Sequence, residues 1–288
     1  MIDLHTHMLW GWDDGPDDWP QSLSMLRVAA EDGITAIVLT PHVFRSDRHD
    51  GDLTVLGRRM AEFDEAAARS GVPVELHWGA EVAVRPEVVE AIERHRFTID
   101  ATRYVFVEFP PAQVTERSKI LMARLLRKGL VPIIGHPERN PGFVERPERL
   151  YDLVAQGCAV QVTAMSLTGG FGRDAQRAVR LFMNHNLVHI IASDAHGDVL
   201  RPPVLSRAAK AAEAIVGPEK AGAMVREIPQ AILEDRALPD WGRPTNPFRC
   251  RIWLGRRTSV AWLRGRQTGG GAAPGRAQAS AIETKSKK

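Results

Sequence analysis

Residues 1–7 read Met-Ile-Asp-Leu-His-Thr-His, a short apolar run that ends in two histidines one residue apart. Alternate residues of a β-strand point to the same face, so His5 and His7 can reach one metal ion together. Two polar residues at a strand end also occur without a metal. The turn Asp13-Asp14-Gly-Pro just downstream presents two carboxylates and strengthens the metal interpretation, although Asp and Gly also form plain solvated turns.

The same arrangement recurs along the chain, because five more apolar runs lead into His, Asp or Glu. These residues are His42, Glu81, Glu108, His136 and the pair Asp194 and His196. Each has an ordinary explanation when taken singly, such as a loop histidine or a surface carboxylate. Six strand ends with metal-type residues together indicate one multinuclear site at the mouth of a barrel. The set contains no cysteine, which favours Mn, Fe, Mg or Zn.

Apolar runs alternate with helical patterns through most of the chain. We expect strands at residues 2–5, 36–40, 74–78, 104–109, 131–134, 159–162 and 188–192. We expect helices at 19–32, 52–70, 87–95, 116–128, 147–156 and 172–184, and two closing helices within 205–235. Glycine follows several helical runs, as at Gly33 and Gly129, where a left-handed cap is favoured. This order is typical of an α/β fold with a parallel sheet.

Seven candidate strands are too few for a regular eight-stranded barrel. We therefore predict a distorted seven-stranded β/α (TIM-like) barrel. An open, doubly wound sheet is the alternative, since both folds give the same order of elements.

Composition places the chain among ordinary globular proteins, with 44% hydrophobic and 25% charged residues in 288. No apolar run is long enough to span a bilayer, and we expect no signal peptide, because the first residues carry no basic segment and include His5 and His7. Two cysteines, Cys158 and Cys250, predict no disulfide framework and fit a reducing compartment. We expect the protein to be cytoplasmic.

The net charge of +3 is unevenly distributed. Residues 243–288 contain eleven Lys or Arg and one acid, a charge of +10, which leaves −7 for residues 1–242. We predict a catalytic domain at 1–242 and a basic, largely disordered extension at 243–288, with disorder from about Gln267. An acidic body argues against a nucleic-acid partner.

Two arginines accompany the candidate ligands. Arg139 follows His136 by three residues, and Arg201 lies on the loop after His196. Arginine suits bidentate binding of phosphate, whereas a salt bridge of Arg139 with Glu138 or another acid is the alternative. Cys250 and Arg256 match the Cys-x5-Arg pattern of thiolate phosphatases, but the residues between them are too bulky for a phosphate cradle. The histidines at 49, 77, 95, 185 and 189 are expected to be ordinary surface or core residues.

These motifs, spread over residues 1 to about 237, resemble the polymerase-and-histidinol-phosphatase (PHP) superfamily. The resemblance is closest to its bacterial capsular and exopolysaccharide tyrosine phosphatases, because carboxylates stand at Asp14 and Glu108, where other members have histidine. It implies a distorted barrel with a site for up to three ions, commonly manganese, with Fe, Zn or Mg as alternatives. It implies that Arg139 and Arg201 bind phosphate.

The resemblance also implies a division of the ligands. The first ion would be held by His5, His7, Glu81 and Asp194, the second by Glu81, Glu108 and His136, and the third by Asp14, His42 and His196.

The activity implied is metal-dependent hydrolysis of phosphotyrosine in the tail of a membrane-associated bacterial tyrosine kinase that controls capsular or exopolysaccharide export. The alternatives are another phosphoesterase of the superfamily, a histidinol phosphatase or a nuclease, and a non-catalytic metal-binding scaffold. Arginines alternate with Phe248, Trp253, Trp262 and other apolar residues in the extension. This pattern predicts contact with an anionic membrane surface, at the inner membrane, and an extension without a role is the alternative.

Overall fold

The computed structural model describes residues 1–44, 53–110 and 114–248. Several predictions concern residues outside these ranges. They are the predictions for His49, for Cys250 and the Cys-x5-Arg pattern, for the disordered segment and for most of the membrane-contact segment. Within the described ranges, no helix is both long and apolar enough to span a bilayer.

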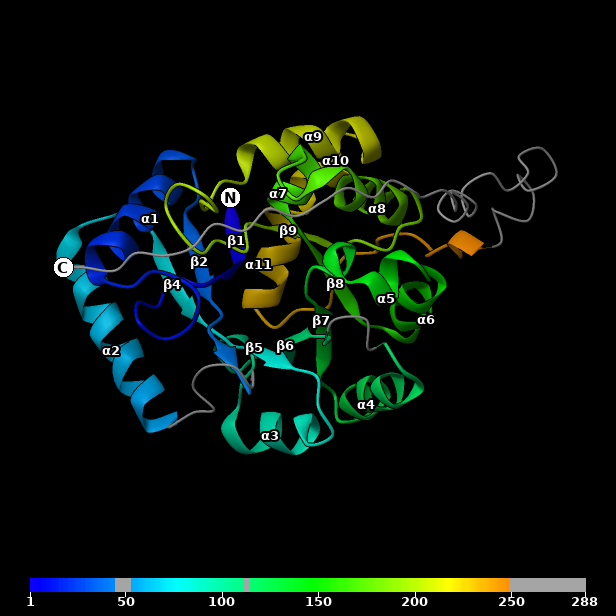
Figure 1. The fold of residues 1–288 in the computed structure, drawn as a ribbon, viewed down its shortest axis with the longest axis horizontal. Coiled ribbons are helices and arrows are strands. Elements are labelled where there is room, and N and C mark those ends of the chain that lie inside the picture. Colours follow the sequence, from blue (N-terminus) through cyan, green and yellow to red (C-terminus); the bar gives the residue numbers. More distant parts are fainter. Residues whose placement is uncertain (45–52, 111–113, 249–288) are drawn as a thin grey trace, which may run out of the picture. The chain divides into compact units, whose positions relative to one another are not determined.

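Nine strands in the described residues pair in parallel throughout. They are β1 (Ile2–Thr6), β2 (Ala36–Leu39), β3 (His42–Val43), β4 (Glu75–Trp78), β5 (Glu81–Ala83), β6 (Tyr104–Glu108), β7 (Val131–Ile134), β8 (Ala159–Thr163) and β9 (Ile190–Ala192). They form two sheets, with the strand orders β1-β2-β4 and β3-β5-β6-β7-β8-β9. Figure 1 shows the strands in the centre of the molecule with helices around them.

The nine strands follow seven paths, because β2 with β3 and β4 with β5 are each one path that is briefly interrupted. Thr40 and Pro41 separate the first pair, and Gly79 and Ala80 separate the second. The interruptions lie side by side, since the Gly79 N–H donates to the Leu39 carbonyl at 2.9 Å. Each of the seven predicted strands lies on one path, with its ends within two residues of the observed ones.

The ring of strands is closed by β1 and the segment after β9. The Asp194 N–H donates to the His5 carbonyl at 2.9 Å, and the His7 N–H donates to the Ala195 carbonyl at 2.8 Å. A parallel bridge also joins Thr6 to Ala195. The distorted seven-stranded barrel is therefore confirmed, and the open sheet is excluded.

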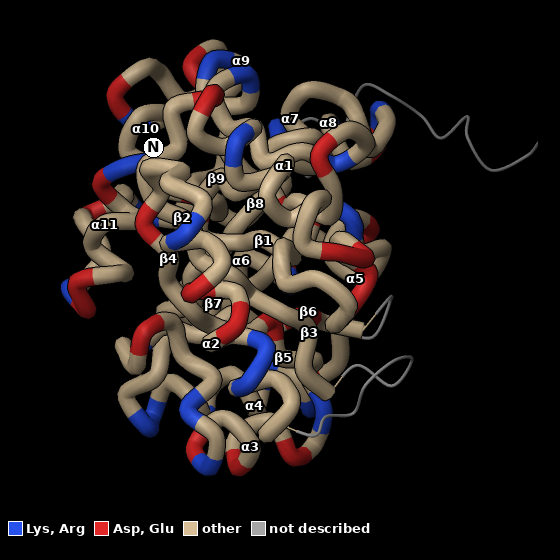
Figure 2. The backbone as a smooth tube through the Cα atoms, turned by 90° about the vertical axis from the view of Figure 1, so that its left-hand side faces the viewer, with Lys and Arg blue, Asp and Glu red and all other residues tan. Residues whose placement is uncertain are grey.

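Helices surround the strands. They are α1 (Trp19–Glu31), α2 (Leu53–Ser70), α3 (Val88–His95), α4 (Glu116–Arg127), α5 (Pro141–Val144), α6 (Glu148–Gln156), α7 (Ala164–Thr168), α8 (Gly172–Asn184), α9 (Ser206–Val216), α10 (Pro218–Ala223) and α11 (Glu227–Leu233), with 3₁₀ turns η1 (Ile99–Ala101) and η2 (Pro137–Arg139). The six helices predicted up to residue 184 agree with the structure to within one residue at each end. Acidic and basic residues are mixed on helices such as α3 and α9 (Figure 2), so these helices present polar faces to solvent.

One prediction of local structure is wrong, and the sequence also missed some short elements. Residues 205–235 form three helices rather than two, because Gly217, at φ 84°, and Pro218 end α9 and begin α10. The strands β3 and β5 and the helices α5 and α7 were not predicted. They have two to five residues each, too few to show a hydrophobic period.

The inward faces of the strands lead directly to the candidate ligands. Tyr104 and Phe106 of β6 belong to a cluster that joins residues of β1, β2 and β6–β9 to Ile228 and Ile232 of α11. Because side chains alternate along a strand, Glu108 points to the same side as Phe106. In the same way Asp194 follows Ala192 of β9. Helix α11 thus closes one end of the barrel, and the polar residues lie at the other.

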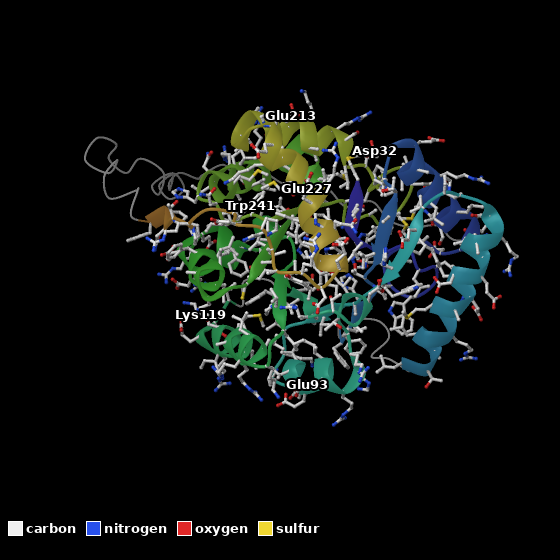
Figure 3. All side chains as sticks on the ribbon, turned by 180° about the vertical axis from the view of Figure 1, so that it is seen from behind. Asp32, Glu93, Lys119, Glu213, Glu227 and Trp241 are labelled. Atoms are coloured by element: carbon white, nitrogen blue, oxygen red, sulfur yellow. The ribbon has the colours of Figure 1, made fainter. Side chains whose placement is uncertain are left out.

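The buried residue His189 gives the fold a predictable dependence on pH. Its Nδ1 accepts a hydrogen bond from the Val160 N–H at 3.2 Å, so the ring is neutral at that nitrogen. Trp241, labelled in Figure 3, stacks on the ring at 6.3 Å. Burial, and secondly the charge of Lys220, lowers the pKa of His189 to about 4.

We expect the protein to lose more stability on acidification than a His189→Asn variant does. The unfolded chain takes up a proton near pH 6.5, whereas the folded chain resists it until about pH 4, so the cost grows as pH falls through this interval. At pH 4 the difference amounts to about 3 kcal/mol. Urea unfolding of both proteins between pH 7 and 4 measures it, with His95→Asn on α3 as the control. Parallel curves for the wild type and His189→Asn would contradict the expectation.

Candidate metal centre

All nine predicted ligands converge at the carboxyl-terminal ends of the barrel strands. His5 lies in β1, His42 and Glu81 begin β3 and β5, and Glu108 ends β6. The loops after β1, β7 and β9 carry His7 and Asp14, His136, and Asp194 and His196, respectively. Six of the nine line one cavity of about 220 Å³, together with Arg139 and Arg201.

Glu81 lies at the centre of the group and is 1% exposed. Its Oε1 is 2.9 Å from His136 Nε2, and its Oε2 is 3.1 Å from His42 Nδ1 and 3.2 Å from His5 Nε2. Within the described residues Oε2 accepts no hydrogen bond of good geometry. Burial favours the neutral acid, but the facing imidazoles of His5, His136 and His42 hold the pKa of Glu81 well below its usual value. A buried carboxylate in this position requires a cation.

The tautomers of His5 and His7 fit a metal. Gln161 Oε1 accepts from the His136 N–H at 3.1 Å and lies 3.2 Å from His5 Nδ1, so His5 Nδ1 is the donor. Asp13 Oδ2 accepts from His7 Nδ1 at 3.0 Å. In the neutral rings both Nε2 atoms then carry lone pairs, yet they lie only 3.1 Å apart. A cation bound by both resolves this contact, and such hydrogen bonds to the outer nitrogens are typical of metal-binding histidines.

The charge of the site supports the same conclusion. Burial opposes protonation of His7, but the carboxylates of Asp13 and Glu81 raise its pKa to about 10. Burial and the neighbouring His7 lower the pKa of His196 to about 4. The carboxylates therefore favour a positive charge at His7, and a metal ion can supply that charge in place of a proton.

The possible ligand atoms form four overlapping groups, and within each group the atoms lie within 4.8 Å of one another. The groups are His7, Asp14, His42 and His196; His5, His7 and Glu81; His5, His136 and Asp194; and His42, Glu81 and Glu108. The first contains all three residues assigned to the third ion. None of these groups contains both His136 and Glu108, which were assigned to one ion. The division of ligands among ions stays a prediction.

Two of the ligands have unusual backbone conformations. His136 has φ 33° and Asp194 has φ 52°, a region that non-glycine residues rarely adopt. Asp194 is held there by its hydrogen bond to the His5 carbonyl. Strain of this kind is commonly found at functional sites.

The two arginines meet at Asp194. Both Nη2 atoms donate to Asp194 Oδ2, that of Arg201 at 2.7 Å. The pairing of Arg139 with Glu138 is not found, because Glu138 Oε1 accepts from the Thr163 N–H at 3.0 Å and from Ser166 Oγ at 2.7 Å. Arg139 pairs with another acid, as the alternative held, and still lines the cavity.

The sequence did not reveal which residues support the ligands. Gln161 and Asp13 orient His5 and His7, and Asp3 Oδ1 accepts from the Ser193 N–H at 3.0 Å. A faint signal existed, since Asp3 stands between Ile2 and Leu4 and Gln161 stands between Val160 and Val162. The described histidines predicted to be ordinary, at 77, 95, 185 and 189, belong to none of the ligand groups.

The chain is similar to proteins of capsular polysaccharide synthesis. A family model described as capsular polysaccharide synthesis, CpsB/CapC, matches residues 1–234. The chain is 34% identical to the tyrosine-protein phosphatase YwqE of Bacillus subtilis, over 68% of this chain and 77% of that protein. It is 25% identical to the tyrosine-protein phosphatase CpsB of Streptococcus agalactiae, over 83% of this chain and 100% of the relative.

A solved structure is similar over nearly its whole length. It comes from the work on YwqE of Bacillus subtilis and CpsB of Streptococcus pneumoniae, described as unique metal-dependent tyrosine phosphatases. The match has a TM-score of 0.79 and 30% identity, and it covers 85% of this chain and 99% of the solved one. A beta-aspartyl dipeptidase from Fervidobacterium islandicum, with a TM-score of 0.51 and 13% identity, shares the fold alone.

Proposed function

The chain belongs to the CpsB/CapC family of capsular polysaccharide synthesis proteins, and from this premise we propose that it is a metal-dependent tyrosine-protein phosphatase. One observation carries the proposal. Nine His, Asp and Glu side chains converge at the mouth of the barrel, and six of them line one cavity together with two arginines. This is the set that hydrolysis of a phosphate ester by hard cations requires.

The chain's own residues have separate tasks in this reaction. Asp13 and Gln161 fix the rings of His7 and His5, so that their Nε2 atoms face Glu81. Divalent ions held by the nine ligands would supply Lewis acidity toward water and the phosphoryl group. Arg139 and Arg201 receive the phosphoryl oxygens and spread their charge.

The leaving group and the nucleophile follow from simple acid–base chemistry. A tyrosine phenol has a pKa of about 10, so the phenolate needs little protonation to depart. Among the described residues the one cysteine is Cys158, which is buried. Burial raises the pKa of its thiol to about 12, so Cys158 is not a thiolate nucleophile. Direct attack by water therefore fits the site.

We propose manganese as the metal, in up to three ions, with Fe, Zn or Mg as alternatives. The support is the ligand set, which consists of imidazoles and carboxylates without sulfur. We propose that the nine His, Asp and Glu residues bind these ions and that Arg139 and Arg201 bind the phosphate.

The substrate we propose is the phosphotyrosine-bearing tail of a membrane-associated bacterial tyrosine kinase. The support is the family's connection with capsular polysaccharide synthesis and the tyrosine-phosphatase names of the relatives. We propose a cytoplasmic location, and contact with the inner membrane through the basic extension at 243–288. In the described part of this extension, the Thr245 N–H donates to the His185 carbonyl at 2.9 Å.

Removal of the metal is expected to abolish turnover of a phosphotyrosine peptide, and manganese to restore it. Metal analysis before and after chelation gives the number of ions. Histidinol phosphate and single-stranded DNA, tested side by side, separate the other phosphoesterase activities. If either compound were hydrolysed faster than the phosphotyrosine peptide, the protein would be assigned that activity instead. If it bound metal and hydrolysed none of the three, it would be a metal-binding scaffold.

A further inference from the structure

One aromatic ring lies beside both arginines of the site. Phe171 is half-buried in the turn between α7 and α8. The guanidinium carbon of Arg139 is 4.7 Å from the centroid of its ring, and that of Arg201 is 5.5 Å away. No prediction from the sequence involved this residue.

The two guanidinium groups need such a neighbour. They carry like charges and bind the same oxygen of Asp194, so they repel each other across a short distance. Asp194 offsets part of the repulsion. The face of an aromatic ring is electron-rich and attracts a cation within about 6 Å, which an aliphatic side chain of similar size does not.

The turn that carries Phe171 is rich in glycine. Gly169 and Gly172 have φ values of 89° and 87°, which other residues rarely adopt. A Cβ at Gly170 would lie 2.6 Å from Met165 Cε, so the chain passes close to α7 there. Three glycines thus leave one side chain in the turn, and that side chain faces the arginines.

Each arginine has one hydrogen-bond donor without a partner in the described part of the chain. Within the described residues, Nε of Arg139 and Nε of Arg201 are buried and have no hydrogen-bond acceptor. Both residues line the same cavity as the predicted metal ligands. An anion with several oxygens suits two neighbouring guanidinium groups.

We propose that Phe171 is a positioning residue that holds Arg139 and Arg201 side by side as a two-armed clamp for the phosphoryl oxygens. This inference rests on the proposed function, because the clamp is the part of the phosphatase site that binds phosphate. Phe171 acts on the arginines and not on the reacting atoms. Its aromatic face, rather than its bulk, is what the clamp needs.

Three variants of the manganese-loaded, full-length protein test the proposal. Phe171→Leu removes the aromatic face, Phe171→Tyr keeps it, and Leu181→Ala changes an exposed residue of α8 as a control. The probes are inorganic phosphate, measured by calorimetry, and a phosphotyrosine peptide, measured by steady-state kinetics. Metal content and the thermal midpoint are recorded for each variant.

We expect Phe171→Leu to raise the Kd of phosphate and the KM of the peptide about tenfold, with metal content and thermal midpoint unchanged. Phe171→Tyr and Leu181→Ala should bind phosphate as the wild type does. Phosphate has no ring, so a loss confined to the peptide would mean that Phe171 contacts the substrate, and the proposal would be wrong. Equal losses in the Leu and Tyr variants would also overturn it. If the wild type bound phosphate without hydrolysing the peptide, the proposed function would fail and calorimetry would still decide on the clamp.

Discussion

Arg139→Ala is expected to lower kcat/KM for a phosphotyrosine peptide by about 10²–10³-fold. Arg139 lines the cavity with its guanidinium anchored to Asp194, and the proposed reaction uses this residue to bind the phosphoryl oxygens. Arg139→Lys should recover only part of the loss, because an ammonium keeps the charge and lacks the fork of donors. His136→Ala should also remove activity, since it deletes an imidazole 2.9 Å from Glu81.

Three controls accompany this measurement. Arg173→Ala removes an exposed arginine of α8 and should leave kcat/KM unchanged. Cys158→Ser and Cys250→Ser should stay active, because the proposed reaction uses no thiolate. A folded Cys250→Ser protein without activity would overturn the metal mechanism, and an unaffected Arg139→Ala protein would remove the arginine from the phosphate site.

The sequence predicted the barrel and brought out all nine candidate ligands for a simple reason. Parallel strands end at the same edge, so a residue such as Glu108 or Asp194 needs only to follow an apolar run in order to lie at the mouth. A polar residue that follows an apolar run is a local pattern, and local patterns are what a single sequence contains.

The supporting residues could not be predicted in this way. Gln161 reaches His5 across 156 positions, and Asp3 reaches Ser193 across 190. Such pairs form only because the barrel closes, and a local sequence pattern contains no information on that closure. Phe171 is hidden for a related reason, since its role depends on two arginines 32 residues before it and 30 after it. The division of the ligands among ions requires distances, and in the structure the possible groups overlap.

Gly135→Ala is expected to disrupt the metal centre without touching a ligand. Gly135 follows β7, and a Cβ there would lie 2.9 Å from Glu81 Oε1 and 3.6 Å from His5 Cε1. Glu81 is buried among imidazoles and cannot swing aside without losing its contact with His136. We expect metal affinity and phosphotyrosine hydrolysis to fall by about 10–100-fold, the usual effect of disturbing the support of a metal ligand.

Metal analysis and peptide kinetics on Gly135→Ala test whether metal binding and activity depend on the position of Glu81. Gly57→Ala is the matched control, since a Cβ in this part of α2 meets nothing within 4 Å. That variant should keep its metal and activity and gain up to about 1 kcal/mol of stability, because alanine is the better helix former. Added manganese should partly rescue Gly135→Ala, since a weakened site fills at higher concentration. Full metal content and wild-type kinetics in Gly135→Ala would show that Glu81 has room to move, and its central place in the metal centre would then be lost.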